Sequence, residues 1–76
     1  MASKVHELKI TPEYFEAVFM GTKTFEIRKN DRGFKVGDML ILKEWNGSYT
    51  GKKLARKVTY ITDYQQKPGY VVMAIE

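Results

Sequence analysis

Hydrophobic and polar residues alternate along most of the chain, a period of two that is typical of β-strands with one buried face. In residues 5–10, His6, Leu8 and Ile10 share one face of such a strand. The same alternation marks four further strands, at residues 23–29, 39–45, 54–62 and 70–75. Short segments rich in Gly, Asn and Asp separate these strands and predict turns.

One segment has the period of a helix instead. Residues 11–13, Thr-Pro-Glu, form a strong start signal, with a hydroxyl N-cap, proline at the first helical position and an acid in the first turn. Phe15, Val18 and Phe19 then fall on one apolar stripe. Gly21 is suited to end the helix as its C-cap.

One strand, one helix and four more strands predict an α+β domain that is mostly β and covers residues 1–76. Five short strands leave sheet edges exposed, which favours curling into a small β-barrel with the helix closing one end. A chain of 76 residues buries only about 60% of the surface of its unfolded form. We therefore expect a shallow surface cleft rather than a large buried enzyme pocket.

Composition removes several classes of site. The chain has no cysteine, which excludes disulfides, thiolate metal sites and cysteine nucleophiles. Because His6 is the sole histidine and the carboxylates are scattered, we expect no metal site, and nothing in the sequence indicates a cofactor. The lack of cysteine and of a signal peptide favours the cytoplasm. No apolar run approaches the roughly 20 residues of a membrane span, so we expect no membrane contact.

The net charge of +4 and the pI near 9.4 favour anionic partners, with nucleic acid first among them. Basic residues concentrate on the fourth strand and its approach: Lys52, Lys53, Arg56 and Lys57. They either contact a phosphate backbone, which makes binding salt-dependent, or keep an edge strand soluble. Three tyrosines are candidates for stacking against bases: Tyr14, Tyr49 and Tyr64.

Lys23, Glu26 and Arg28 are the charged residues with the most specific arrangement. Glu26 and Arg28 project together from the second strand, opposite Phe25 and Ile27, which we expect to face the core. Beside the helix they would form a charged cleft, in which Arg28 donates to phosphate or a base and Glu26 accepts from an exocyclic amine. Alternatively this is a solvated face, where Lys23 complements the helix dipole and Glu26 pairs with Arg28.

The run GTKTFEIR at residues 21–28 resembles the G-x-K-x-x-E-x-R signature of ASCH domains, which belong to the PUA-like superfamily. The segments HELKI at 6–10, KNDR at 29–32 and VGD at 36–38 resemble more closely one subgroup, the short bacterial and phage-borne ASCH-like proteins of the domain of unknown function DUF3850. The resemblance covers nearly the whole chain.

This resemblance implies a PUA-like β-barrel whose signature residues line a cleft between helix and barrel, and it implies RNA binding. The leading hypothesis is a non-catalytic module that binds RNA, a nucleotide or a modified base. The expected ligand-binding residues are His6, Lys9, Lys23, Glu26 and Arg28. His6 either faces this cleft or is half buried in its strand and hydrogen-bonded to backbone.

Some ASCH relatives of similar fold are amidohydrolases acting on N4-acylated cytidines, or ribonucleases, which makes a small hydrolase the first alternative. In the amidohydrolases a lysine matching Lys23 works with a threonine and a distant glutamate. Here Glu26 takes the threonine's place, and no counterpart of the distant glutamate can be placed. The catalytic residues would then be Lys23 and Glu26, with Glu26 as general base. A protein-interaction accessory domain is the second alternative, and the oligomeric state is left open.

Overall fold

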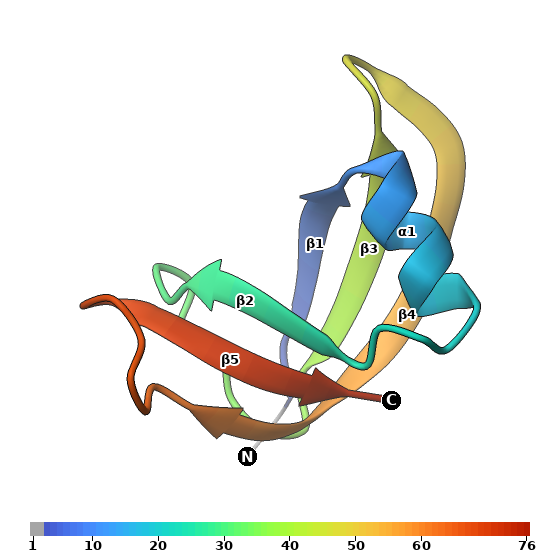
Figure 1. The fold of residues 1–76 in the computed structure, drawn as a ribbon. Coiled ribbons are helices and arrows are strands. Elements are labelled where there is room, and N and C mark those ends of the chain that lie inside the picture. The colour runs from blue at the N-terminus through green and yellow to red at the C-terminus, as the bar shows by residue number, and fades with distance from the viewer. Residues whose placement is uncertain (1–2) are drawn as a thin grey trace.

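The fold of residues 3–76, described by a computed structural model, is mostly β with one short helix, as the sequence predicts (Figure 1). The elements in chain order are β1 (Val5–Ile10), α1 (Pro12–Phe19), β2 (Phe25–Lys29), β3 (Met39–Trp45), β4 (Tyr49–Thr62) and β5 (Tyr70–Ile75). Two strand boundaries differ from the expected ones. β2 begins at Phe25 rather than at residue 23, and β4 begins at Tyr49 rather than at residue 54.

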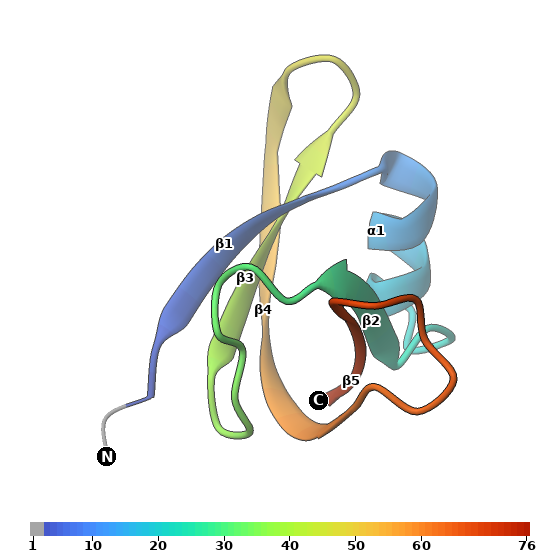
Figure 2. The same ribbon diagram turned by 90° about the vertical axis from the view of Figure 1, so that its left-hand side faces the viewer.

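The five strands form one mixed sheet in the order β1-β3-β4-β5-β2. β1 pairs with β3 in parallel, and the other neighbours are antiparallel. β4 belongs to both halves of the sheet: its first part pairs with β3, and its last part pairs with β5 after an irregularity between Val58 and Tyr60. Such irregularities bend a strand, and Figure 2 shows β4 curving from the upper hairpin to the bottom of the molecule, where it meets β5.

The described sheet is not closed, so it is a barrel only in a loose sense. β1 and β2 are its two ends and do not pair with each other. Arginine side chains span the gap instead: Arg28 Nη2 donates to the Lys9 carbonyl and Arg32 Nη1 to the Glu7 carbonyl, each at 2.7 Å. These bonds satisfy carbonyl groups on the edge of β1, which would otherwise be available to another strand.

The core lies between the two halves of the sheet and α1, which packs against β3. On β1 the predicted alternation is confirmed, since His6, Leu8 and Ile10 are buried and their neighbours are exposed. The core is formed by Leu8, Ile10, Phe15, Val18, Phe34, Leu40, Leu42, Val58, Val71, Met73 and Ile75. The centre of the protein is therefore aliphatic, with two phenylalanines at its margin.

The predicted apolar stripe of the helix is confirmed for Phe15 and Val18, which are buried, and wrong for Phe19, which is 66% exposed. One residue corresponds to about 100° around an α-helix, so Phe19 turns away from the face that carries Val18. Thr11 occupies the N-cap position as predicted, but its hydroxyl makes no capping hydrogen bond.

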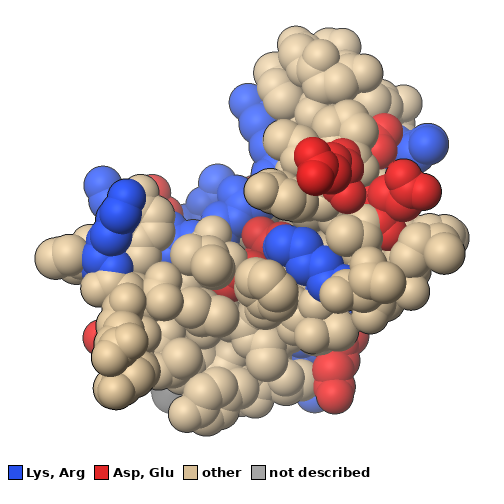
Figure 3. All heavy atoms as spheres, in the orientation of Figure 1, with Lys and Arg blue, Asp and Glu red and all other residues tan. Residues whose placement is uncertain are grey.

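The prediction that Phe25 and Ile27 face the core is also wrong. These side chains are 43% and 50% exposed, whereas Glu26 between them is only 3% exposed. The register explains the reversal, because Glu26 lies opposite Met73, a core residue of β5. Figure 3 accordingly shows little charge on the outer surface over β2 and β5. Alternation defined the two faces of this strand, and pairing with β5 set which one points inward.

Gly21 follows the helix with φ = +82°, the left-handed conformation expected at a helix C-terminus. Substituting Gly21→Ala should lower the free energy of unfolding by about 1 kcal/mol, because L-residues are strained at positive φ. Overlap with more distant residues is not the cause, since apart from the adjoining backbone no described atom lies within 4 Å of an added Cβ. Urea denaturation can measure the loss, and an unchanged midpoint would contradict the assigned turn.

Candidate functional site

Glu26 is a buried carboxylate held between two cations. Lys23 Nζ donates to its Oε1 at 2.7 Å, and Arg28 Nε donates to its Oε2 at 2.9 Å. The Glu26 side chain is 4% exposed, against 16% for Lys23 and 27% for Arg28. The three side chains together carry a charge of +1, so the group as a whole favours an anion.

The turn after α1 positions Lys23. The amides of Thr22 and Lys23 both donate to the Ala17 carbonyl at 3.0 Å, so the chain folds back against the end of the helix. The Lys23 ammonium is then held by the Phe25 carbonyl at 2.7 Å as well as by Glu26. A long, rotatable side chain is thereby restricted to one direction.

Arg28 connects the charged group to the first strand. Its Nε binds Glu26 while its Nη2 binds the Lys9 carbonyl across the gap between β1 and β2. These two bonds use two of the five N–H groups of a guanidinium. The same side chain therefore spans the open sheet and orders the carboxylate.

The charged group lies in a cleft of about 670 Å³ between α1 and the ends of β1 and β2. Its lining residues are Lys9, Ile10, Thr11, Glu13, Tyr14, Ala17, Thr22, Lys23, Phe25, Glu26, Ile27 and Arg28. Figure 3 shows basic side chains gathered in the hollow below the helix. The volume is within the range of small-molecule sites in proteins.

Two aromatic rings border the ammonium group in this cleft. Lys23 Nζ lies 5.4 Å from the ring centroid of Tyr14 and 4.9 Å from that of Phe25, both within the range of cation–π contact. Tyr14 comes from α1 and Phe25 from β2, so the rings approach from different elements. The cleft thus combines a carboxylate, two cations and two aromatic faces.

Four of the predicted ligand-binding residues, Lys9, Lys23, Glu26 and Arg28, line this cleft. Lys9 takes part through its carbonyl group, because its ammonium is directed to the ring of Trp45 at 4.0 Å. Phe25 was missed as a cleft residue, since the alternation of its strand suggested a core position.

His6 is not among the residues that line the cleft. It is 6% exposed, its Nε2 donates to Asp38 Oδ2 at 2.8 Å, and its ring meets Phe34 edge-on at 4.7 Å. The structure therefore gives neither of the two arrangements considered from the sequence. The histidine is fully buried rather than half buried, and its partner is a side chain rather than backbone.

Asp38 accepts three hydrogen bonds at this buried position, from the amides of Lys4 and Lys35 and from His6. Burial alone would raise the pKa of Asp38. The hydrogen bonds outweigh burial, with the Lys4 amide first, then His6 and Lys35, and the charge of His6 adds to them. The pKa of Asp38 therefore lies below its ordinary value of 3.8. This arrangement ties β1 to the loop before β3.

The basic residues of β4 do not form one surface. Arg56 lies opposite Leu40 on the inward face, and its Nη2 donates to the Val18 carbonyl at 3.3 Å. Lys53 and Lys57 lie on the opposite face of the strand, in register with outward-facing residues of β3. Strand alternation thus separates the predicted phosphate contacts.

A second groove, of about 890 Å³, lies between α1 and the β3–β4 hairpin and includes Lys52 and Lys53. Its buried carboxylate, Glu44, accepts a hydrogen bond from the Thr50 hydroxyl at 2.8 Å. Across residues 3–76, no cluster of three or more His, Asp or Glu side chains could hold a metal ion. No helix in the same range is long and apolar enough to cross a membrane.

Two comparisons relate this chain to known proteins. Residues 5–75 match the model of a family described as a domain of unknown function, DUF3850. An uncharacterized 12.9 kDa protein in the GpA 3′ region of Escherichia phage P2 is 45% identical over 64 residues. The aligned part covers 83% of this chain and 59% of the phage protein, so the match spans less than two thirds of that relative's length. Neither description names a ligand or an activity.

Proposed function

Because the chain belongs to the DUF3850 family, as its sequence resemblance predicted, and the family's description names no activity, we propose from the geometry that the cleft binds a nucleobase of RNA or of a free nucleotide. The observation that carries this proposal is the buried Glu26 carboxylate, held between Lys23 and Arg28 beside two aromatic rings. The proposal is for binding without catalysis.

Hydrogen bonding supports a base as the ligand. Each oxygen of Glu26 accepts one bond from a cation, and a carboxylate oxygen can accept a second. An exocyclic amine of cytosine or adenine is a donor that such an oxygen recognises. Arg28 has further N–H groups that can donate to a base carbonyl or a phosphate.

The walls of the cleft support a flat ligand. Tyr14 is 53% exposed and Phe25 is 43% exposed, so both rings are accessible from solvent. Stacking of a base on an aromatic side chain contributes about 1–3 kcal/mol and is available to every base. An aromatic wall beside hydrogen-bonding groups is the usual arrangement for unstacked bases.

Energetics also favour a functional role for the charged group. Well-packed apolar residues often stabilise a fold as well as, or better than, a buried ion pair of similar volume. Ionisable groups gathered in a cleft are therefore candidates for function. The run GTKTFEIR, which resembles the ASCH signature, supplies the three charged residues of this group. Membership of the ASCH and PUA-like groups, with their association with RNA, is part of the same proposal.

An NMR titration of the labelled domain at low salt tests the proposal. The probes are a short mixed single-stranded RNA and a panel of nucleosides that includes N4-acetylcytidine. Shifts should cluster at the amides of Lys23, Glu26 and Arg28. The absence of shifts there with every probe would overturn the proposal. Conversion of N4-acetylcytidine to cytidine would replace it with the hydrolase alternative.

Tyr14→Ala should weaken nucleoside binding about fivefold to tenfold, because one of the two stacking faces is lost. The stability of the domain should change little, since the side chain is exposed on α1. Tyr64→Ala is the matched control, because that tyrosine is 73% exposed and is absent from the cleft lining. Equal affinities of the two variants would contradict stacking on Tyr14.

A further inference from the structure

The strand register places three lysines side by side on the outer face of the sheet. Lys9 of β1 lies opposite Lys43 of β3, and Lys43 lies opposite Lys53 of β4. Like charges directly opposite each other on neighbouring strands are destabilising. Lys43 Nζ forms an ion pair with Glu7 Oε1 at 3.5 Å, but the glutamate side chain is 67% exposed. Such an exposed pair does little to offset the repulsion.

Two aromatic residues adjoin this row at the start of the β3–β4 hairpin. Trp45 and Tyr49 are cross-strand partners whose rings meet edge-on, with centroids 4.9 Å apart. Lys9 Nζ lies 4.0 Å from the Trp45 ring and Lys43 Nζ lies 4.5 Å from the Tyr49 ring. Tyr49 is 50% exposed and Trp45 is partly buried.

Cation–π contacts account for the directions of Lys9 and Lys43, but they are weak at exposed sites. They do not account for a third lysine in the row, Lys53. Alternating aromatic faces and positive groups are typical of proteins that bind single-stranded nucleic acids, since bases stack on the rings and phosphates bind the cations. We refer to Lys9, Lys43, Lys53, Trp45 and Tyr49 as the lysine–aromatic face.

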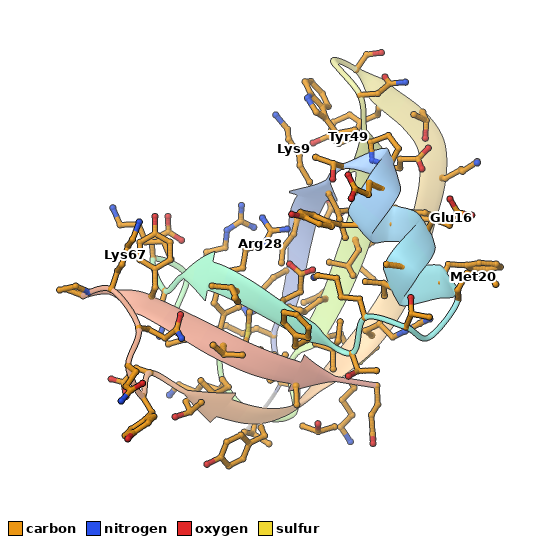
Figure 4. The ribbon with its side chains drawn as sticks, viewed as in Figure 1. Lys9, Glu16, Met20, Arg28, Tyr49 and Lys67 are labelled. Carbon is orange, nitrogen blue, oxygen red and sulfur yellow. The ribbon has the colours of Figure 1, made fainter. Side chains whose placement is uncertain are left out.

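This face is continuous with the cleft through Lys9. The Lys9 carbonyl accepts the hydrogen bond from Arg28 inside the cleft, while its ammonium lies over the Trp45 ring outside it. Figure 4 shows Lys9 between Arg28 and Tyr49, on the same side of the molecule. A strand that leaves the cleft past Lys9 would therefore reach the two aromatic rings.

We propose that the lysine–aromatic face binds the continuation of a single-stranded nucleic acid whose base occupies the cleft. Bases next to the bound one stack on Trp45 and Tyr49, and their phosphates bind Lys9, Lys43 and Lys53. This inference rests on the proposed function and deepens it, because it makes the ligand a polynucleotide rather than a free nucleoside.

The single tryptophan of the chain, Trp45, is a built-in reporter of this face. Single-stranded RNA of about eight nucleotides should quench Trp45 fluorescence and also shift the amides of Lys23, Glu26 and Arg28. Mononucleotides should shift the cleft amides without quenching. DNA of the same sequence shows whether the backbone sugar matters, and quenching by either strand supports the proposal. Equal quenching by a duplex would overturn it, because paired bases cannot stack on the rings.

Tyr49→Ala should weaken binding of the single-stranded RNA about fivefold to tenfold and leave mononucleotide affinity unchanged. Lys43→Gln should reduce the salt dependence of oligonucleotide binding without removing an aromatic ring. The controls are Tyr64→Ala and Lys57→Gln, which change exposed residues outside the cleft and outside the lysine–aromatic face. Equal affinities of the test and control variants would overturn the inference.

The two readouts separate failure of this inference from failure of the proposed function. Cleft shifts without quenching of Trp45 would overturn the inference and leave the cleft as a nucleobase site. Quenching without cleft shifts would overturn the proposed function. It would also overturn the inference that one nucleic-acid strand occupies both the cleft and the lysine–aromatic face. The absence of both signals with every strand, together with the absence of cleft shifts with every nucleoside and mononucleotide, would overturn both.

Discussion

Glu26→Gln is expected to lower the affinity of the cleft for cytidine or adenosine at least tenfold. The amide keeps one oxygen for a cation but presents an NH₂ group where the second oxygen accepted a bond. Hydrogen bonds to charged groups contribute about 1.5–3 kcal/mol, which corresponds to roughly tenfold to a hundredfold in affinity. The affinity for uridine, which has no exocyclic amine, should fall less. The ratio of the cytidine affinity to the uridine affinity should therefore become smaller in the variant.

Nucleosides are the right probe for this variant, because the substitution raises the charge of the group formed with Lys23 and Arg28 from +1 to +2. The added charge attracts phosphate and would mask part of the loss for a nucleotide. Isothermal titration with each nucleoside measures the effect, and circular dichroism confirms folding. Glu16→Gln, an exposed helix position labelled in Figure 4, is the control. Unchanged cytidine affinity in Glu26→Gln would contradict the role of the carboxylate.

Asp38→Asn is expected to lower the free energy of unfolding at neutral pH by about 2–4 kcal/mol. An amide NH₂ cannot accept the bonds that Oδ2 receives from His6 and from the Lys35 amide, so two donors at a buried position lose their acceptor. A domain of this size has only a few kcal/mol of stability in total. A large fraction of the variant should therefore be unfolded at moderate urea concentrations.

The same substitution should change how stability depends on pH. Because the pKa of Asp38 is lower in the folded protein than its ordinary 3.8, its ionised form contributes stability that is complete above 3.8. This contribution is lost as the pH falls below 3.8 and through the pKa that Asp38 has in the folded protein. The difference between the native protein and Asp38→Asn should thus be constant near neutral pH and shrink in acid.

Urea denaturation at several pH values measures this difference. Asp63→Asn is the control, because Asp63 is exposed in the turn between β4 and β5. A stability difference that stays constant down to the acid limit would show that Asp38 is not the group responsible. A small difference at neutral pH would show that water replaces the two hydrogen bonds that Oδ2 receives from His6 and from the Lys35 amide.

Arg28 links the architecture of the sheet to the chemistry of the cleft. The sheet stays open between β1 and β2, and the guanidinium that spans this opening also binds Glu26. The opening therefore brings an edge of β1 and an edge of β2 to the cleft that contains the three charged groups.

Local patterns in the chain were sufficient to predict the number of strands and the one helix. Alternation marks the strands because their side chains point to opposite faces, and proline at position 12 begins the helix where its fixed φ is favourable. The charged group was also foreseeable, since Glu26 and Arg28 are two residues apart on one strand and Lys23 is close to them in sequence. These properties depend on neighbours within a few residues.

Pairing between residues far apart in sequence decided which strand faces are buried and which side chains meet. Register against β5 turned Glu26 inward and Ile27 outward, the reverse of what hydrophobicity suggested, because it places Glu26 opposite Met73, a core residue 47 positions away in sequence. Partners 32 residues apart in sequence, His6 and Asp38, meet in the same way. The row from Lys9 to Lys53 exists only through two strand pairings. Periodicity gives a strand two faces, but the free energy of packing against distant residues selects which of them is buried.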